Sequence, residues 1–240
     1  MNSTRKTALV AGIFYLVSFI SIPTLFLYNA LKNHADFIIS SGTNTGVLWG
    51  GLLEVIVALA GIGTAVTLFP VVRRQNEGMA LGFVAIRTLE AGMIYTGVVT
   101  LHSLVTLRQA GATGADAASL VTTGKSLVAT YNWTFLIGQS LSPAVSALLL
   151  GTLMYQSGLV PRVIPLMGLI GGPLLATAII ATLLGLIVQT NPLAGLAALP
   201  VALWEFSLGV YLVVKGFRPC PITDAMGAAG TTPAQRNVVA

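Results

Sequence analysis

Charged residues are scarce in this sequence. Lysine, arginine, aspartate and glutamate make up 8% of its 240 residues, whereas soluble domains carry about 25%. Hydrophobic residues make up 55%, and the mean hydropathy is +0.88. A chain this apolar cannot stay solvated, so both a water-soluble globule and a disordered chain are excluded. The composition indicates a membrane protein that crosses the bilayer several times.

Cysteine and histidine are almost absent. Cys220 is the single cysteine, so an intrachain disulfide and a multi-cysteine zinc site are excluded. The two histidines, His34 and His102, do not follow a glutamate with the Glu-x-x-His spacing of di-iron bundles. The sequence also has no Walker loop, no dinucleotide-binding glycine pattern and no Gly-x-Ser-x-Gly elbow. We therefore predict no metal site and no cofactor.

Six apolar runs fill most of the chain. At ~1.5 Å per residue, a helix of about 20 residues crosses the ~30 Å core of a bilayer. The runs are continuous and lack the alternation of outer-membrane strands, so they predict helices. They lie at residues 8–31, 46–68, 79–107, 126–155, 163–188 and 196–214. The predicted fold class is an all-α transmembrane bundle of six spans over residues 1–218.

The C-terminal segment, residues 219–240, is rich in Gly, Ala, Thr and Pro and shows no apolar periodicity. This composition predicts a disordered cytoplasmic tail. At the other end, the first apolar run follows Arg5 and Lys6 as in a signal peptide. It extends about 23 residues and lacks a small-residue cleavage site, so we expect it to be retained as the first span.

The basic residues predict the orientation. Their net charge of +5 is spread over single residues and pairs, which does not indicate nucleic-acid binding. Eight lie on the side of the two termini, three lie on the other side, and Arg87 lies inside a span. An excess of Lys and Arg marks the cytoplasmic side, so both termini are predicted to be cytoplasmic. The larger set is Arg5, Lys6, Arg73, Arg74, Arg162, Lys215, Arg218 and Arg236, and the smaller set is Lys32, Arg108 and Lys125.

Several polar residues lie deep inside the predicted spans. The charged ones are on the order of 12 Å or more from the nearest interface, too deep to snorkel, so they must face the bundle interior. They are Glu54, Arg87, Glu90 and Glu205, and Asn132 and Gln139 are candidate hydrogen-bond partners. Arg87 and Glu90 are three residues apart and can pair on one helical face. We expect Glu54 or Glu205 to be the second partner of Arg87.

Three buried acids against one buried base leave a formal surplus of two negative charges. An unpaired buried carboxylate costs several kcal/mol, so protons, a cation or a cationic ligand must supply the balance. This predicts a protein that binds or moves a small cationic or proton-coupled solute. One alternative is a membrane scaffold or accessory subunit, in which the cluster fixes helix register. Another is an intramembrane enzyme that uses the glutamates as acid, base or metal ligands, for which the sequence offers no catalytic motif.

Two prolines, Pro143 and Pro173, lie inside spans four and five. Small residues and prolines in membrane helices ordinarily accompany close packing. The alternative is that the two prolines interrupt their helices around a cavity near the midplane, as in transporters. The sequence leaves this choice open, and it also leaves open whether the three buried glutamates share one cavity.

Three motifs are distinctive in combination. They are Arg-Thr-Leu-Glu-Ala at 87–91, Ser-Gly-Leu-Val-Pro-Arg at 157–162, and Trp-Glu-Phe-Ser-Leu-Gly at 204–209 followed by Lys-Gly-Phe at 215–217. With them the sequence resembles, over residues 7–219, the bacterial integral-membrane proteins of domain-of-unknown-function family 4386. The resemblance implies a six-span architecture and emphasises Arg87, Glu90 and Glu205, but it implies no substrate. We expect a multi-pass protein of the bacterial cytoplasmic (inner) membrane.

Overall fold

The computed structural model describes residues 3–33, 36–40, 42–111, 117–189 and 192–230. Within these ranges the regular elements are all helical, and six segments are long and apolar enough to cross a membrane. They are Ser3–Leu27, Thr45–Val72, Glu77–Ala110, Ala117–Ser157, Val163–Leu183 and Gly195–Val214. The predicted all-α bundle of six spans is confirmed.

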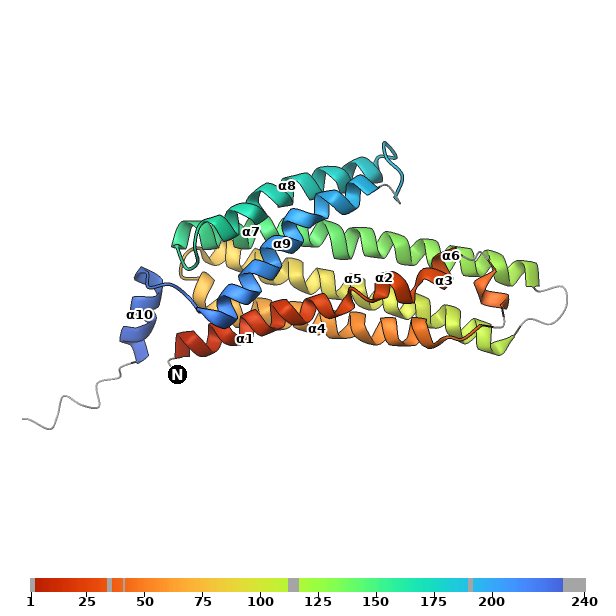
Figure 1. The fold of residues 1–240 in the computed structure, drawn as a ribbon, viewed down its shortest axis with the longest axis horizontal. Coiled ribbons are helices and arrows are strands. Elements are labelled where there is room, and N and C mark those ends of the chain that lie inside the picture. The colour runs from red at the N-terminus through yellow and green to blue at the C-terminus, as the bar shows by residue number, and fades with distance from the viewer. Residues whose placement is uncertain (1–2, 34–35, 41, 112–116, 190–191, 231–240) are drawn as a thin grey trace, which may run out of the picture.

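Figure 1 shows these helices as one elongated bundle. The first span consists of α1 (Ser3–Val17), a 3₁₀ turn η1 (Ser18–Ser21) and α2 (Thr24–Leu27). The short elements α3 (Asn29–Asn33) and η2 (Phe37–Ile39) lead into the second and third spans, α4 (Thr45–Val72) and α5 (Glu77–Ala110). The fourth span combines α6 (Ala117–Phe135), a π-helical segment η4 (Leu136–Leu141) and α7 (Ser142–Ser157). The fifth and sixth spans are α8 (Val163–Leu183) and α9 (Pro192–Val214), and α10 (Pro221–Gly230) follows them.

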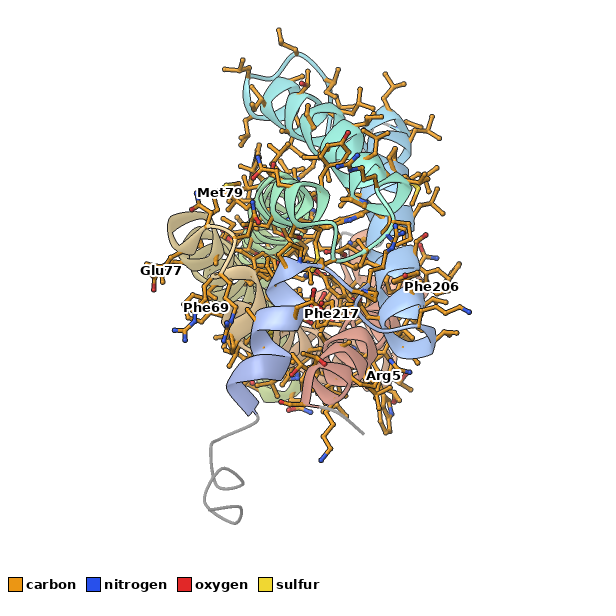
Figure 2. The ribbon with its side chains drawn as sticks, turned by 90° about the vertical axis from the view of Figure 1, so that its left-hand side faces the viewer. Arg5, Phe69, Glu77, Met79, Phe206 and Phe217 are labelled. Carbon is orange, nitrogen blue, oxygen red and sulfur yellow. The ribbon has the colours of Figure 1, made fainter. Side chains whose placement is uncertain are left out.

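The outward surface of α8 and α9 is apolar. Ile170, Leu174, Leu203 and Phe206 are all exposed, and Figure 2 shows the labelled Phe206 projecting away from the bundle. A contiguous apolar surface of this kind is an interaction site in a soluble protein. Around a six-span bundle it is the surface that contacts the hydrocarbon of the bilayer.

Helix packing fixes the rotation of α9. A Cβ atom on Gly12 of α1 would lie 2.7 Å from the carbonyl oxygen of Gly209, so α1 and α9 cross with their backbones in contact. On the other side of α9, Gly168 of α8 leaves the space that the fully buried ring of Trp204 occupies. Small residues permit such close approach in membranes. With Trp204 held against α8, the next residue, Glu205, is turned toward α5.

The two ends of the bundle carry different sets of basic residues. The start of α1, the α4–α5 and α7–α8 turns and the end of α9 lie at the end that carries α10, while α3, the end of α5 and the start of α6 lie toward the opposite end (Figure 1). Arg5, which is labelled in Figure 2, lies at the α10 end. It donates to the carbonyl oxygens of Leu212 at 2.8 Å and Val213 at 2.5 Å. This contact caps α9 and ties the first span to the sixth. Arg236 lies outside the described residues.

The C-terminal segment departs from the prediction of disorder. Residues Pro221–Gly230 form α10, and Ile222 of this helix is buried in the core cluster that it shares with α1, α4 and α9. Met226, one turn later, packs against the same cluster. The hydroxyl of Thr223 accepts a hydrogen bond from the backbone N–H of Cys220 at 2.8 Å, which fixes the start of the helix. The apolar pair at i and i+4 is the sequence signal for this helix, and the overall composition of the segment obscures it. Residues 231–240 lie outside the described residues.

Candidate functional site

Three charged side chains meet inside the bundle and form what we call the Arg87 triad: Arg87, Glu90 and Glu205. Nη1 of Arg87 donates to Oε2 of Glu90 at 3.0 Å, and Nη2 donates to Oε1 of Glu205. These are the two ion pairs among the described residues, and the side chain of Arg87 is only 5% exposed. The pairing of Arg87 with Glu90 follows from their spacing on α5, and Glu205 of α9 is the second partner.

Aromatic rings complete the setting of the guanidinium group. Its central carbon lies 5.6 Å from the ring centroid of Tyr15 and 5.9 Å from that of Phe83. Tyr15 in turn makes an edge-on contact with Trp204, with centroids 6.3 Å apart. Cation–π contacts of this kind strengthen when the cation is desolvated. The rings therefore hold Arg87 in place without supplying any further negative charge.

A cavity of about 310 Å³ opens beside the triad. Arg87, Glu90 and Glu205 all line it, and the first, second, third, fourth and sixth spans contribute to its wall. The remaining lining residues are Ser18, Phe19, Ser21, Ile22, Thr24, Leu25, Val57, Gly61, Phe135, Gln139, Pro143 and Ala202. Two of the three buried glutamates thus reach one open space, whereas Glu54 does not line it.

The first span is interrupted where it borders this cavity. Pro23 has no N–H to donate, and between α1 and α2 the chain turns through η1. Hydroxyl groups from the same segment donate to the backbone: Ser18 to the carbonyl of Tyr15 at 2.6 Å and Thr24 to that of Ser21 at 2.7 Å. Serine and threonine hydroxyls commonly satisfy backbone groups that a proline frees inside a membrane. We did not predict this break, although the run Ser18 to Thr24 carries its signal.

The fourth span is also distorted where it lines the cavity. Pro143 removes the usual helical donor for the carbonyl of Gln139, and the preceding turn widens into the π-helical segment η4. The hydroxyl of Ser142 donates to the carbonyl of Ile137 at 3.3 Å within this wide turn. Both Gln139 and Pro143 line the cavity, and π-helical turns are frequent at functional sites. Pro173, by contrast, lies within a continuous α8.

Glu54 belongs to a separate polar cluster, the Glu54 group, which we define as Glu54, Tyr28, Lys32, Tyr131 and Gln139. The carboxylate is 1% exposed, and its Oε1 accepts a hydrogen bond from the hydroxyl of Tyr131 at 2.6 Å. Tyr28, Gln139 and, over a longer distance, the charge of Lys32 also act on it. No acid or base of the Arg87 triad is among its partners in the described part of the chain.

Lys32 enters the Glu54 group from the end of the bundle opposite α10. Its Nζ lies 5.2 Å from the ring centroid of Tyr131 and 5.5 Å from that of Phe135. Burial against these rings lowers the pKa of Lys32, while the carboxyl group of Glu54 opposes that shift. Burial and the same carboxyl raise the pKa of Tyr28 above its ordinary value. From the sequence alone, Lys32 is predicted only to be one of the three basic residues in the connections on the side away from the termini.

No side-chain hydrogen bond joins Asn132 to any described member of the two clusters. Asn132 lines a second cavity, of about 290 Å³, with Lys32, Lys125 and several apolar side chains, and its backbone carbonyl oxygen accepts a hydrogen bond from the side-chain amide of Gln189 at 2.8 Å. Asn132 and Gln139 are seven residues apart, and the two face different spaces. Of the two predicted amide partners, Gln139 is the one that contacts a buried glutamate.

Potential metal ligands are dispersed. Across the described ranges, no group of three or more His, Cys, Asp or Glu side chains is close enough together to hold a metal ion. His102 of α5 bonds through Nδ1 to the carbonyl of Val98 at 2.9 Å, and His34 lies outside the described residues.

A bundle of six apolar helices around an ion-paired interior defines a multi-pass integral membrane protein. A family model described as domain of unknown function (DUF4386) matches residues 10–216. Because this match covers most of the chain, the protein belongs to the DUF4386 family, and the resemblance seen in the sequence is confirmed. No curated protein and no solved structure matches the chain.

Proposed function

We propose that the Arg87 triad and its cavity bind a small organic cation, which a proton can replace. The observation that carries this proposal is the charge balance at the cavity wall. Two carboxylates face one guanidinium there, so the ionised triad has a formal charge of −1. A buried excess charge is costly unless a counter-charge accompanies it. An organic cation in the cavity, or a proton on Glu90 or Glu205, supplies that counter-charge.

The other cavity walls favour an amine with an apolar part. Phe19, Ile22, Leu25, Val57 and Phe135 face the same space as the triad. A pocket of roughly 300 Å³ or more with apolar walls and a few convergent polar groups is typical of small-molecule sites. The interrupted first span and the widened fourth span beside it are the kind of discontinuity that transporters place at their binding sites. These features support movement of the cation across the membrane after binding.

We further propose that the protein lies in the cytoplasmic membrane of a bacterium with both termini in the cytoplasm. Seven members of the larger set, all except Arg236, belong to elements at the α10 end of the bundle (Figure 1), and such an excess favours the cytoplasmic side. Reporter fusions after Ala240 and at Gly114 should report opposite compartments. The same compartment for both would contradict this orientation.

Thermal unfolding of the purified protein tests the binding site. The probes are a series of primary alkylamines from methylamine to hexylamine, tetramethylammonium, and sodium chloride at matched ionic strength. A ligand at 100 times its Kd stabilises the folded state by about 2.7 kcal/mol. We expect the larger amines to stabilise the wild type, more strongly at higher pH because protons compete, and sodium chloride to have no comparable effect.

Matched substitutions assign the effect to the triad. Glu205→Gln keeps the shape of the side chain but removes the excess charge, so the response to amines should be lost. Glu77→Gln, at the exposed start of α5, should keep it. A wild-type protein that responds to no amine at any pH, or a Glu205→Gln variant that responds equally, would favour the scaffold, in which the triad only fixes helix register.

A further inference from the structure

Glu54 is a buried carboxyl group outside the Arg87 triad, and it does not line the cavity beside the triad. It lies on α4 with 1% of its surface exposed, and it forms no ion pair with any described residue. Oε1 accepts the hydrogen bond from Tyr131 at 2.6 Å, while Oε2 is buried without a hydrogen-bond partner among the described residues. A carboxylate in this setting has hydrogen bonds to neutral groups but no directly contacting counter-charge among the described residues, which an ionised buried group requires.

The groups that face Glu54 define its possible charge states. Tyr28 lies before α3, Tyr131 belongs to α6, and Gln139 belongs to η4. From α5, the imidazole ring of His102 lies against Gly51, one turn from Glu54 on α4, and bonds to its own helix. Lys32 is the one cation that acts on Glu54 among these groups, and it does so from above the ring of Tyr131 rather than by direct contact.

A protonated carboxyl group satisfies this arrangement. Oε1 accepts from the Tyr131 hydroxyl, and the proton occupies Oε2, which has no other partner. When the proton leaves, the ammonium group of Lys32 is the nearest counter-charge. The side chain of Lys32 is exposed at the end of the bundle opposite α10. Tyr131, which contacts Glu54, and the exposed Lys32 above its ring thus lie on the side of Glu54 toward that end of the bundle.

We propose that Glu54 is a proton-binding site, separate from the Arg87 triad, that holds a proton at neutral pH and exchanges it with the end of the bundle opposite α10. The proton is transferred from hydronium in the solvent to one carboxyl oxygen: one O–H bond of hydronium breaks, the O–H bond of the carboxyl group forms, and water is left. The proposal does not depend on cation binding at the triad. It predicts a neutral carboxylic acid whose spectroscopic signal belongs to Glu54.

Infrared spectroscopy of the purified protein tests this proposal, because a protonated carboxyl group has a C=O stretching band distinct from that of a carboxylate. The wild type at neutral pH should show such a band, Glu54→Gln should lose that component, and high pH should abolish it. Tyr131→Phe should shift the component to higher frequency, since the hydrogen bond to Oε1 is removed. Glu90→Gln, the matched control, should leave the Glu54 component in place.

Two outcomes would overturn the proposal. One is a neutral-pH spectrum in which Glu54→Gln removes no protonated-carboxyl intensity. The other is a component that is insensitive to Tyr131→Phe and is lost in Glu90→Gln. Should Glu54→Gln not fold, the frequency shift in Tyr131→Phe decides the question alone, because that variant retains Glu54.

Discussion

The Arg87 triad and the Glu54 group lie in the same bundle but balance their charges differently. In the triad, a guanidinium group with fixed charge contacts two carboxylates directly. In the Glu54 group, a tyrosine hydroxyl contacts the carboxyl group, and the nearest cation lies above an aromatic ring. One cluster is held together by ion pairs, and the other by hydrogen bonds to neutral groups.

This difference separates two uses of a buried glutamate. A glutamate paired with arginine always faces a positive charge, because arginine does not lose its proton in proteins. With two such glutamates around one arginine, the triad can attract a cation to the cavity that it lines. A glutamate that contacts only neutral groups, such as tyrosine hydroxyl groups, has no cation in direct contact, so its protonation state can change with pH. Gln139 lies between the two, since it acts on Glu54 and also lines the cavity of the triad.

Removing the guanidinium group should have the largest effect. Arg87→Ala strands Glu90 and Glu205 in the bundle interior, and breaking a buried pair in this way costs about 3 to 5 kcal/mol. Chemical unfolding in detergent micelles and the yield of folded protein measure the loss. Arg162→Ala is the control, because Arg162 is exposed and packs on the ring of Tyr155 at 5.5 Å, and its loss should cost less than about 1 kcal/mol. Equal losses would mean that Arg87 is solvated and that the triad is not a buried unit.

A double-mutant cycle should then show that the two clusters are independent. Arg87→Lys keeps the positive charge but loses the forked geometry that contacts both glutamates. Combined with Glu205→Gln, it should show a coupling energy of about 1 to 3 kcal/mol, whereas combined with Glu54→Gln the coupling should stay below about 0.5 kcal/mol. Free energies of unfolding for the single and double variants give both values. Equal coupling energies in the two cycles would mean that the two clusters form a single site.

The sequence could predict the depth of these residues but not their partners. Hydropathy places Glu54, Arg87, Glu90 and Glu205 far from either interface, and a spacing of three residues pairs Arg87 with Glu90. Which of the other two glutamates reaches Arg87 depends on the rotation of each helix about its axis. That rotation is set by contacts between spans, such as Trp204 against Gly168. It cannot be predicted from the periodicity of the sequence. Tyr131 and Lys32 were missed for the same reason.

Local irregularities were also only partly predictable. Pro143 indicated a distortion near Gln139, and the structure has the π-helical segment there. The break before Pro23 was missed, because the run from Ala8 to Leu31 has continuous apolar character, and the hydroxyl groups that support the break donate to backbone within the same run. The tail was assigned as disordered from its composition, although Ile222 and Met226 pack on the core.

Removing the hydroxyl group of Tyr131 should have a smaller effect than either change at the triad. Tyr131→Phe leaves Oε1 of Glu54 without its donor, and hydrogen bonds inside membrane proteins contribute about 1 kcal/mol. Tyr28→Phe is the matched control, because the hydroxyl of Tyr28 is buried without a hydrogen-bond partner in the described structure, so its removal should cost less. Unfolding free energies compare the two. A larger loss of unfolding free energy in Tyr28→Phe would show that Tyr28, which follows the first span, stabilises Glu54 more than Tyr131 does.

The smallest effect concerns the pH dependence that Lys32 gives to the Glu54 group. Burial lowers the pKa of Lys32 below that of the unfolded chain, which is about 10.4. Between the two pKa values the unfolded state binds more protons, so the folded state gains stability as pH rises through this window. The gain should stay below about 1 kcal/mol, because the side chain is exposed and solvent screens its charge. Lys32→Gln should flatten the slope of unfolding free energy against pH in this range, whereas Lys125→Gln, at an exposed position of α6, should leave it. A slope that persists in Lys32→Gln would place Lys32 in water, and the Glu54 group would then lose its link to the outside of the bundle.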